Sequence, residues 1–187
     1  MKIILASASP RRKELLKLIF DDFEVSPSNA DETLPEGLPA ENAAEYLACL
    51  KAKSINNAAN TVVIGCDTVV VIDGKILGKP KNESDCKKML KTLSGKSHFV
   101  FTGVCILYNN QEISFTEKTE VVFHDLSENE IEKYINTGEP FDKAGGYGIQ
   151  GKGSLLVKEI HGDYFNVVGL PVSAVNQKLK SFFNTNT

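Results

Sequence analysis

The sequence predicts an α/β protein with a mixed, twisted central sheet flanked by helices. Short apolar runs rich in Val and Ile alternate with segments that repeat apolar residues at helical spacing. One pair of runs is joined by a two-residue turn and therefore forms a hairpin, whereas other runs are separated by whole helices. A sheet that contains both kinds of connection is mixed, and helices between its strands cover its faces.

The N-terminal elements follow from local signals. Residues 2–6 are apolar and are predicted as a buried strand. Pro10 suits the first position of a helix, with Ser9 as its N-cap, because proline lacks the N–H that the first turn leaves unpaired. Residues 26–39 are polar and rich in proline, which predicts a loop. A second helix is expected over residues 40–58. Its apolar side should consist of Tyr46, Leu47, Leu50 and Ile55.

The middle of the chain contains a predicted hairpin. The dipeptide Asp73-Gly74 in TVVVIDGKILG suits a two-residue turn, and a β-branched strand at residues 61–65 precedes this hairpin. The other elements predicted here are a helix at residues 83–93, a strand at 98–108, a turn at Asn109-Asn110 and a partner strand that ends near Phe123.

The C-terminal third begins with a helix start. Ser127 and Glu130 have the spacing of a capping box. The glycine-rich stretch DKAGGYGIQGKG follows, and then a strand is predicted at residues 155–160. The last helix should run from near Pro171 to about Phe183. Since no linker divides two cores, residues 1–187 are predicted to form a single domain.

Composition bounds the class of protein. The chain has 187 residues, of which 42% are apolar and 24% charged, as in ordinary globular proteins. A net charge of −3 argues against a general nucleic-acid binder. No apolar run approaches the length of a membrane span, and the N-terminus does not resemble a signal peptide. We therefore expect neither a nucleic-acid nor a membrane partner.

The cysteines and histidines do not have the spacing of a zinc site. The cysteines are widely separated and mostly lie in apolar stretches, which predicts buried free thiols, a reducing compartment and a cytoplasmic location. His98 is expected to be packed or hydrogen-bonded, and His124 and His161 should lie at strand ends. The four cysteines are Cys49, Cys66, Cys86 and Cys105.

The stretch SASPRR joins the first strand to the first helix and is suited to hold phosphate. A helix N-terminus has unpaired N–H groups and a partial positive charge. Ser7 and Ser9 add hydroxyl donors, and Arg11 and Arg12 add guanidinium groups that bind phosphate oxygens in pairs. The alternative is a capped surface helix with two solvated arginines.

Three further charged residues extend this hypothesis. Lys51 falls beside the apolar side of the second helix, where the alternative is a lysine whose stem packs at the edge of the core. Asp67 in VVIGCDTVV directly follows a strongly apolar strand, where a carboxylate needs water, a partner or a metal; the alternative is a turn or capping aspartate. Lys79 ends the hairpin that begins at Asp67, so we expect the two side chains to approach each other.

This set of charges matches what a nucleoside triphosphate hydrolase needs, because phosphoryl chemistry depends mainly on positioning and charge stabilisation. A divalent cation would bridge phosphate oxygens, with one or two carboxylates from Glu32, Asp31 or Asp67 as its ligands. A carboxylate near a water could also accept its proton. The residues alone leave open whether Asp67 is that base or a metal ligand.

Six motifs, in the same order and at the same separations, resemble the signatures of the Maf family of nucleotide pyrophosphatases: SASPRR, GCDTVV, LGKP, LSGKSHFVFTG, GEPFDKAGGYGIQG and GDYFNVVGLP. The resemblance covers about residues 5–171. It implies a hydrolase of phosphoric anhydrides that cuts between the α- and β-phosphates, releasing a monophosphate and a diphosphate. It also implies a divalent cation (Mg²⁺, Mn²⁺ or Co²⁺), a homodimer, and the two-lobed fold around a cleft that is shared with inosine triphosphatase.

The resemblance also assigns roles to residues. Asp67 matches the proton acceptor of the family. The sequence departs from the family at Cys66 and Gly146, where alanine is common. The residues that match the phosphate and metal pocket are Ser7, Arg11, Arg12, Glu32, Lys51 and Lys79. The positions linked to substrate choice are Arg12, Thr68 and Gln150.

The run DKAGGYGIQG looks like the branch of the family that acts on dTTP and UTP, and sometimes on CTP, rather than on 7-methyl-GTP. A glutamine amide offers a donor and an acceptor side by side, so Gln150 could pair with N3–H and the adjacent carbonyl of uracil or thymine. The implied purpose is to remove surplus or modified pyrimidine nucleotides. The alternatives are a broader or purine-directed pyrophosphatase and a nucleotide-binding regulator of cell division.

Overall fold

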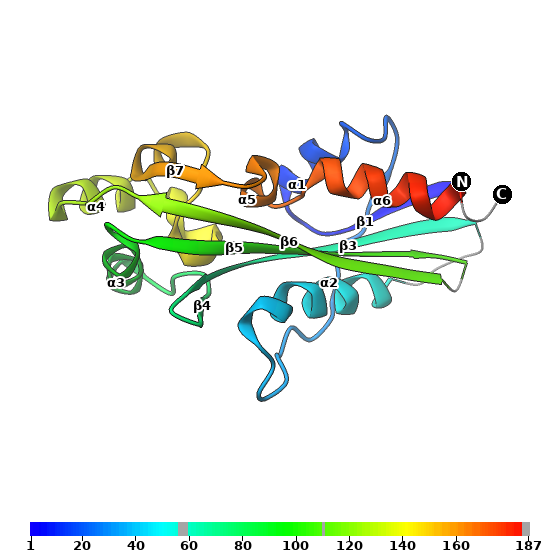
Figure 1. The fold of residues 1–187 in the computed structure, drawn as a ribbon, viewed down its shortest axis with the longest axis horizontal. Helices are drawn as coiled ribbons and strands as arrows, with labels where there is room; N and C mark the ends of the chain where they lie inside the picture. The colour runs from blue at the N-terminus through cyan, green and yellow to red at the C-terminus, as the bar shows by residue number, and fades with distance from the viewer. Residues whose placement is uncertain (56–59, 110, 185–187) are drawn as a thin grey trace. The chain divides into compact units, whose positions relative to one another are not determined.

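The computed structural model describes residues 1–55, 60–109 and 111–184 (Figure 1). Contacts within the chain divide it into two compact units, in agreement with the two lobes that the resemblance implies. The cleft and the single domain over residues 1–187 stay predictions. Unit 1 consists of Met1–Asp67, Thr102–Glu117 and Gly169–Thr187, and unit 2 consists of Thr68–Phe101 and Lys118–Val168.

The described residues form a seven-stranded sheet in the order β2-β1-β3-β5-β6-β7, with β4 paired to β3. Strand β1 is parallel to β2 and β3, whereas β4 is antiparallel to β3 and β7 to β6. The predicted mixed sheet is therefore confirmed. The strands are β1 (Lys2–Ala6), β2 (Glu24–Val25), β3 (Thr61–Ile72), β4 (Lys75–Leu77), β5 (Ser97–Tyr108), β6 (Gln111–Phe123) and β7 (Val157–His161).

The first residues of α1 and α4 are set by the capping residues that the sequence predicted. Ser9 caps α1 by accepting a hydrogen bond from the backbone N–H of Arg12, and Pro10 is its first residue. Ser127 and Glu130 form the predicted capping box of α4. The helices are α1 (Pro10–Leu16), α2 (Ala43–Lys53), α3 (Glu83–Leu93), α4 (Glu128–Ile135), α5 (Tyr164–Val168) and α6 (Val172–Asn184), and the 3₁₀ segments are η1 (Ala40–Asn42), η2 (Glu139–Asp142), η3 (Ala144–Gly146) and η4 (Gly151–Leu156).

In unit 1, α2 covers one face of the sheet, and α1 and α6 cover the other (Figure 1). The contact between α2 and the sheet is unusually close because glycines face the helix. A Cβ atom at Gly65 would lie 2.2 Å from the carbonyl oxygen of Ala48, and one at Gly103 would lie 2.2 Å from the backbone carbon of Ala44. The helix meets these glycines with its small residues. Its buried side chains are Ala43, Ala44, Leu47, Ala48 and Ala52.

The predicted course of α2 is corrected on two points. The helix begins with a 3₁₀ turn and ends at Lys53, where the N–H of Ser54 closes the last turn on Leu50; part of the predicted extension, residues 56–58, lies outside the described residues. Of the four residues expected on its apolar side, Leu47 alone is buried. The close packing against glycine selects the alanine face instead, because larger side chains would not fit there.

Three other elements of the structure differ from the sequence prediction, each for a local reason. Strand β3 continues without a break through Asp67, which the sequence placed after a strand rather than within one. Strand β7 begins at Val157 because the two leucines before it belong to η4. The elements β2 and α5 are too short to produce a periodic pattern and were not predicted.

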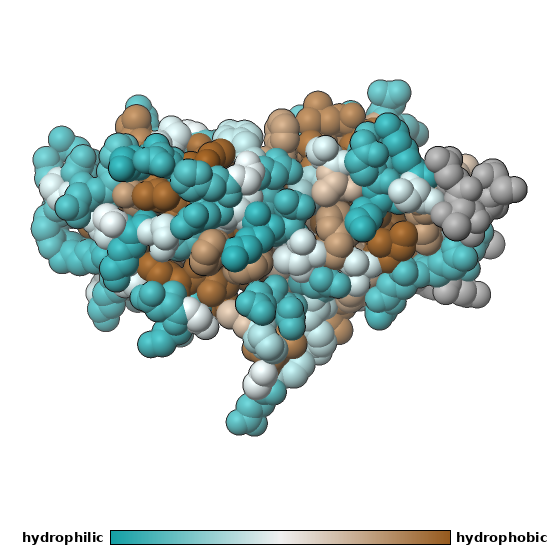
Figure 2. Space-filling view, in the orientation of Figure 1, coloured by the Kyte–Doolittle hydropathy of each residue, from teal (hydrophilic) through white to brown (hydrophobic). Residues whose placement is uncertain are grey.

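In unit 2, α3 and α4 pack against each other, and Lys87 of α3 forms ion pairs of 2.7 Å with Glu128 and Glu132 of α4. The outward face of α4 is hydrophilic (Figure 2). The core beneath contains Phe123 and Tyr147, whose rings meet edge to face. No helix in the described part of the chain is both long and apolar enough to cross a membrane.

We predict that Gly103→Ala destabilises the protein by about 3 kcal/mol, because the added methyl group overlaps the backbone of α2 rather than a movable side chain. Urea denaturation followed by circular dichroism measures the effect. The matched control is Gly78→Ala, where a Cβ atom would meet nothing within 4 Å, and its midpoint should stay close to that of the wild type. Equal midpoints for the two variants would contradict the packing described for α2.

Candidate functional site

One lysine lies between two carboxylates in unit 1. The ammonium group of Lys51, on α2, is 2.5 Å from Oδ1 of Asp67 on β3 and 3.1 Å from Oε1 of Glu32 in the loop before α2. The side chains of Lys51 and Asp67 are each 12% exposed, whereas that of Glu32 is about half exposed. The structure thus brings together three of the predicted site residues.

This ion pair explains how a carboxylate can stand inside an apolar strand. The residues of β3 around Asp67 are almost all buried. An ionised carboxylate in such surroundings is costly unless a cation and hydrogen bonds compensate it. Lys51 supplies both from α2. The alternatives of a turn aspartate at residue 67 and of a lysine that merely lines the core edge do not describe the geometry.

The loop that carries Glu32 distinguishes it from its acidic neighbour. Oδ1 of Asp31 accepts hydrogen bonds from the N–H and the hydroxyl of Thr33, at 3.0 and 2.7 Å, and these bonds lower the pKa of Asp31. The Asp31 carboxylate is therefore engaged by its own loop, while that of Glu32 reaches Lys51. Carboxylate oxygens are the donors that Mg²⁺ and Mn²⁺ prefer, so the donor chemistry of Glu32 and Asp67 suits a hard divalent cation, although both carboxylates pair with Lys51 in this structure.

The SASPRR stretch forms a second group in unit 1. The buried Ser7 hydroxyl accepts hydrogen bonds from the N–H of Ser9, at 3.3 Å, and from Nη1 of Arg12, at 3.2 Å. Nε of Arg12 donates to the carbonyl of Gly169 at 2.9 Å. Arg11 precedes Arg12 in the same first turn. Since α1 has seven residues, its own dipole is modest, and the positive charge of this region comes mainly from the guanidinium groups.

The Gly169 carbonyl connects the two groups. It also accepts a hydrogen bond from the thiol of Cys66, at 3.2 Å, and Cys66 directly precedes Asp67. Burial raises the pKa of the Cys66 thiol, which stays a neutral donor. Sequence reasoning missed Gly169, because a backbone acceptor leaves no side-chain signal.

Three predicted residues lie in unit 2: Thr68, Lys79 and Gln150. Lys79 is exposed, and its segment is fixed to the glycine-rich stretch because the N–H of Gly145 donates to the carbonyl of Gly78 at 2.9 Å. Gln150 is exposed directly after the buried Ile149. The predicted approach of Lys79 to Asp67 and the role of each residue stay predictions.

The glycine-rich stretch is packed and held in place. The Tyr147 hydroxyl lies 2.6 Å from Nε2 of His98, and the Tyr134 hydroxyl accepts a hydrogen bond from the N–H of Gly148 at 3.2 Å. The carboxylate of Glu139 accepts backbone N–H groups on the far side of Gln150, from Lys152 at 3.0 Å and from Gly153 at 3.4 Å. Side chains on both sides therefore fix the backbone that presents Gln150. Tyr134 and Glu139 were not singled out from the sequence.

His98 is packed and hydrogen-bonded, as predicted, between the rings of Phe123 and Tyr147. Its Nδ1 is buried and has no hydrogen-bond partner among the described residues. Burial lowers the pKa of His98 to about 4 and raises the pKa of Tyr147. His98 is therefore neutral near pH 7 and supports the loop rather than the chemistry.

Taken together, the mixed sheet and the Lys51–Asp67 ion pair on its third strand define an α/β protein with a charged centre in unit 1. The fold is similar to that of the Staphylococcus aureus Ham1 protein, with a TM-score of 0.50 and 18% identity over 67% of this chain and 73% of that one. Residues 2–182 match the family described as Maf-like protein, and the chain belongs to this family.

Two relatives match nearly the whole chain. A dTTP/UTP pyrophosphatase of Thermosipho africanus is 59% identical over 175 residues, which are 94% of this chain and 90% of that protein. A dTTP/UTP pyrophosphatase of Bacillus mycoides is 50% identical over 182 residues, which are 97% of this chain and 95% of that protein.

We predict that His98 makes the protein less stable in acid. The unfolded state takes up a proton on this residue near pH 6.5, whereas the folded state does so only near pH 4, so stability falls as the pH decreases through this window. Between these limits the wild type should lose about 3 kcal/mol more unfolding free energy than His98→Gln. Urea titrations across this pH range measure the difference. The control His161→Gln alters an exposed histidine and should lose as much unfolding free energy as the wild type. If His98→Gln also lost as much as the wild type, His98 would not be buried in its neutral form.

Proposed function

We propose that this protein hydrolyses dTTP and UTP, and also CTP or modified pyrimidine triphosphates, to the nucleoside monophosphate and diphosphate. The observation that carries this proposal is the buried Asp67 carboxylate paired with Lys51 in the same unit as the Ser7–Arg12 group. Two relatives that share half or more of their residues with this chain are named dTTP/UTP pyrophosphatases. A reaction that cleaves a polyanion by water needs fixed cations and a base, and this arrangement supplies both.

Each residue of unit 1 then has a role. Arg11 and Arg12 bind phosphate oxygens, and Arg12 is oriented for this by Ser7 and by the Gly169 carbonyl. Asp67 accepts the proton of the water that attacks the α-phosphorus. The P–O bond to the β-phosphate breaks, and the diphosphate leaves with the electron pair. Lys51 holds the Asp67 carboxylate in place and offsets its charge.

A divalent cation completes this proposal. Glu32 and Asp67 would hold Mg²⁺, Mn²⁺ or Co²⁺, because their oxygen donors suit a hard cation. When bound, the cation neutralises charge on the triphosphate. Because Asp67 has two carboxylate oxygens, the roles of base and ligand are compatible in one residue. Lys79 binds the phosphate chain as well.

We assign recognition of the nucleobase to Gln150, and Thr68 and Arg12 contribute to it. The Gln150 amide can donate to a pyrimidine carbonyl and accept from N3–H. The hydrogen bonds from Gly148 to Tyr134 and from Lys152 to Glu139 fix the backbone on both sides of Gln150, so the segment that carries this side chain needs little ordering when a nucleobase binds. A backbone that is ordered before binding lowers the entropy cost of recognising the nucleobase.

We further propose that the protein acts as a homodimer in the cytoplasm on free nucleotides, without a nucleic-acid or membrane partner. Its four cysteines are free thiols, which suits a reducing compartment. The net charge of −3 supports a small substrate held by local cations rather than a nucleic acid.

We predict that Asp67→Asn lowers kcat for dTTP by roughly 10²–10⁴-fold, because an amide cannot accept the proton, while nucleotide affinity measured without metal changes little. Chromatography of the products measures turnover, and isothermal titration measures binding. Asp73→Asn is the matched control, because it makes the same exchange at the exposed tip of the β3–β4 hairpin. Asp73→Asn should keep the full rate. If Asp67→Asn also kept the full rate, Asp67 would not be the catalytic base.

The same assay separates the alternatives. With the wild type, dTTP and UTP should yield monophosphate and diphosphate, and a chelator should stop the reaction. A preference for purine triphosphates would select the broader pyrophosphatase. Tight binding of nucleotides without turnover would select a regulator of cell division.

We predict that Gln150→Ala lowers the ratio of kcat/KM for dTTP to kcat/KM for dATP by about tenfold, since the pyrimidine loses a partner that both donates and accepts a hydrogen bond. Competition between the two nucleotides in one reaction measures this ratio. Gln177→Ala, an exposed change on α6, serves as control. An equal loss of kcat/KM for both nucleotides would contradict a role of Gln150 in recognising the base.

A further inference from the structure

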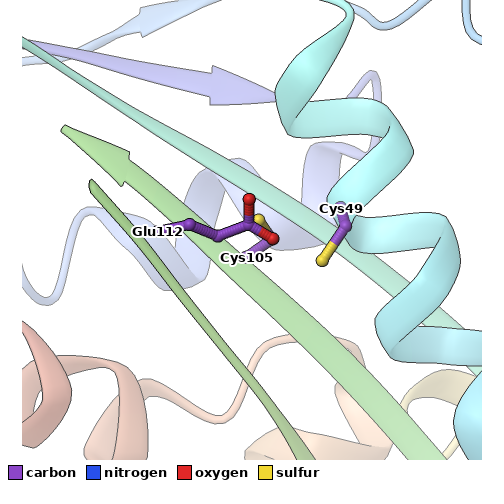
Figure 3. Close-up of side chains that lie close together, drawn as sticks. All are labelled: Cys49, Cys105 and Glu112. Carbon is purple, nitrogen blue, oxygen red and sulfur yellow. The ribbon is translucent and has the colours of Figure 1, made fainter. Parts of the chain in front are cut away.

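Two cysteines and a glutamate of unit 1 converge on one point (Figure 3). Cys49 comes from α2, Cys105 from β5 and Glu112 from β6. The two sulfurs and one carboxylate oxygen all lie within 4.8 Å of one another. Cys105 is buried, Cys49 is half-buried and Glu112 is exposed. None of the three residues belongs to the group around Asp67.

The chemistry of these donors differs from that of the carboxylates at Glu32 and Asp67. Two thiolates and one carboxylate are ligands that Zn²⁺ and similar thiophilic cations prefer, whereas Mg²⁺ requires oxygen alone. The sulfurs lie beside the apolar cluster of α2 and the sheet, which contains Ala48 and Ala52. The exposed Glu112 leaves one side open to solvent, so an ion could enter and keep a water molecule.

We propose that Cys49, Cys105 and Glu112 bind a thiophilic divalent cation of the Zn²⁺ class, with water as the fourth ligand. Each thiol releases its proton to solvent when the sulfur–metal bond forms, so two protons leave for each ion bound. The three donors lie within 4.8 Å of one another, so side-chain movements of about 1 Å would bring them to the roughly 3–4 Å that separates neighbouring ligands of one zinc ion. This site is independent of the proposed hydrolytic reaction.

The positive charge of Lys53 should weaken binding of a cation at this site, and this provides a test. Nζ of Lys53 lies 2.9 Å from Oε2 of Glu112, so an ammonium group already pairs with this carboxylate. A cation that binds Glu112 must displace this ammonium group or accept its repulsion. Removal of the lysine charge should therefore strengthen metal binding, whereas removal of the glutamate charge should weaken it. A pair of thiols without a metal role predicts neither effect.

The experiment is a titration of the full-length reduced protein with Co²⁺, a spectroscopic substitute for Zn²⁺, in the absence of nucleotide. Thiolate ligation gives a sulfur-to-cobalt charge-transfer band in the near ultraviolet, which carboxylate sites lack. We expect this band with the wild type, its displacement by Zn²⁺, and its loss in Cys49→Ser. Glu112→Gln should weaken Co²⁺ binding about tenfold or more, and Lys53→Gln should strengthen it several-fold.

Two controls separate this site from others. Asp67→Asn should keep the band, which distinguishes it from the cation of the proposed hydrolysis. Cys86→Ala removes a thiol of unit 2 that lies outside the cluster and should keep the band as well. Cys49→Ser, Glu112→Gln and Lys53→Gln alter partly exposed side chains, so folding is not at risk. A wild type without the band, a band that survives Cys49→Ser, or equal Co²⁺ affinity for Glu112→Gln and Lys53→Gln would each overturn the proposal.

Discussion

The ion pair between Lys51 and Asp67 depends on how closely α2 approaches the sheet. Gly65 lies two residues before Asp67, and its missing side chain allows the backbone of α2 at Ala48 and Ala52 to come within van der Waals contact of β3. Lys51 belongs to that same turn of the helix. A bulkier residue at position 65 would push the helix outward and leave the carboxylate without its cation. Backbone packing therefore sets the electrostatics of the site.

The two units contribute different physical properties. Unit 1 contains fixed charges whose neighbours hold them in place, as Ser7 and the Gly169 carbonyl do for Arg12. Unit 2 contains a glycine-rich stretch that would be mobile alone but is held by buried side chains, including His98 and Tyr147. Charge suits the phosphate chain that every nucleoside triphosphate carries, whereas a rigid backbone suits discrimination among bases. Unit 1 also contains two sets of potential metal ligands: the oxygen donors of Glu32 and Asp67, which suit hard cations, and the mainly sulfur set of Cys49, Cys105 and Glu112, which suits thiophilic cations.

The sequence predicted those features that local signals determine. The Asp73-Gly74 hairpin, the bounds of α3 and the capping box of α4 were all correct, because each depends on residues close together in the chain. Asp67 was conspicuous because a carboxylate inside an apolar run demands a partner. The identity of that partner, the alanine face of α2 and the role of Gly169 depend on tertiary packing. The cluster of Cys49, Cys105 and Glu112 likewise comes from three separate elements and has no sequence spacing of its own.

We propose that Lys51 and Asp67 take part in nucleotide hydrolysis and do not form merely a structural ion pair. The most direct test compares Lys51→Met, Asp67→Asn and the double variant for unfolding free energy and for dTTP turnover. Removing both charges relieves the unpaired carboxylate that Lys51→Met leaves behind. We predict that the double variant regains stability relative to Lys51→Met, yet turns over no faster than Asp67→Asn. If turnover returned together with stability, the Lys51–Asp67 pair would serve folding alone and Asp67 would not be the catalytic base.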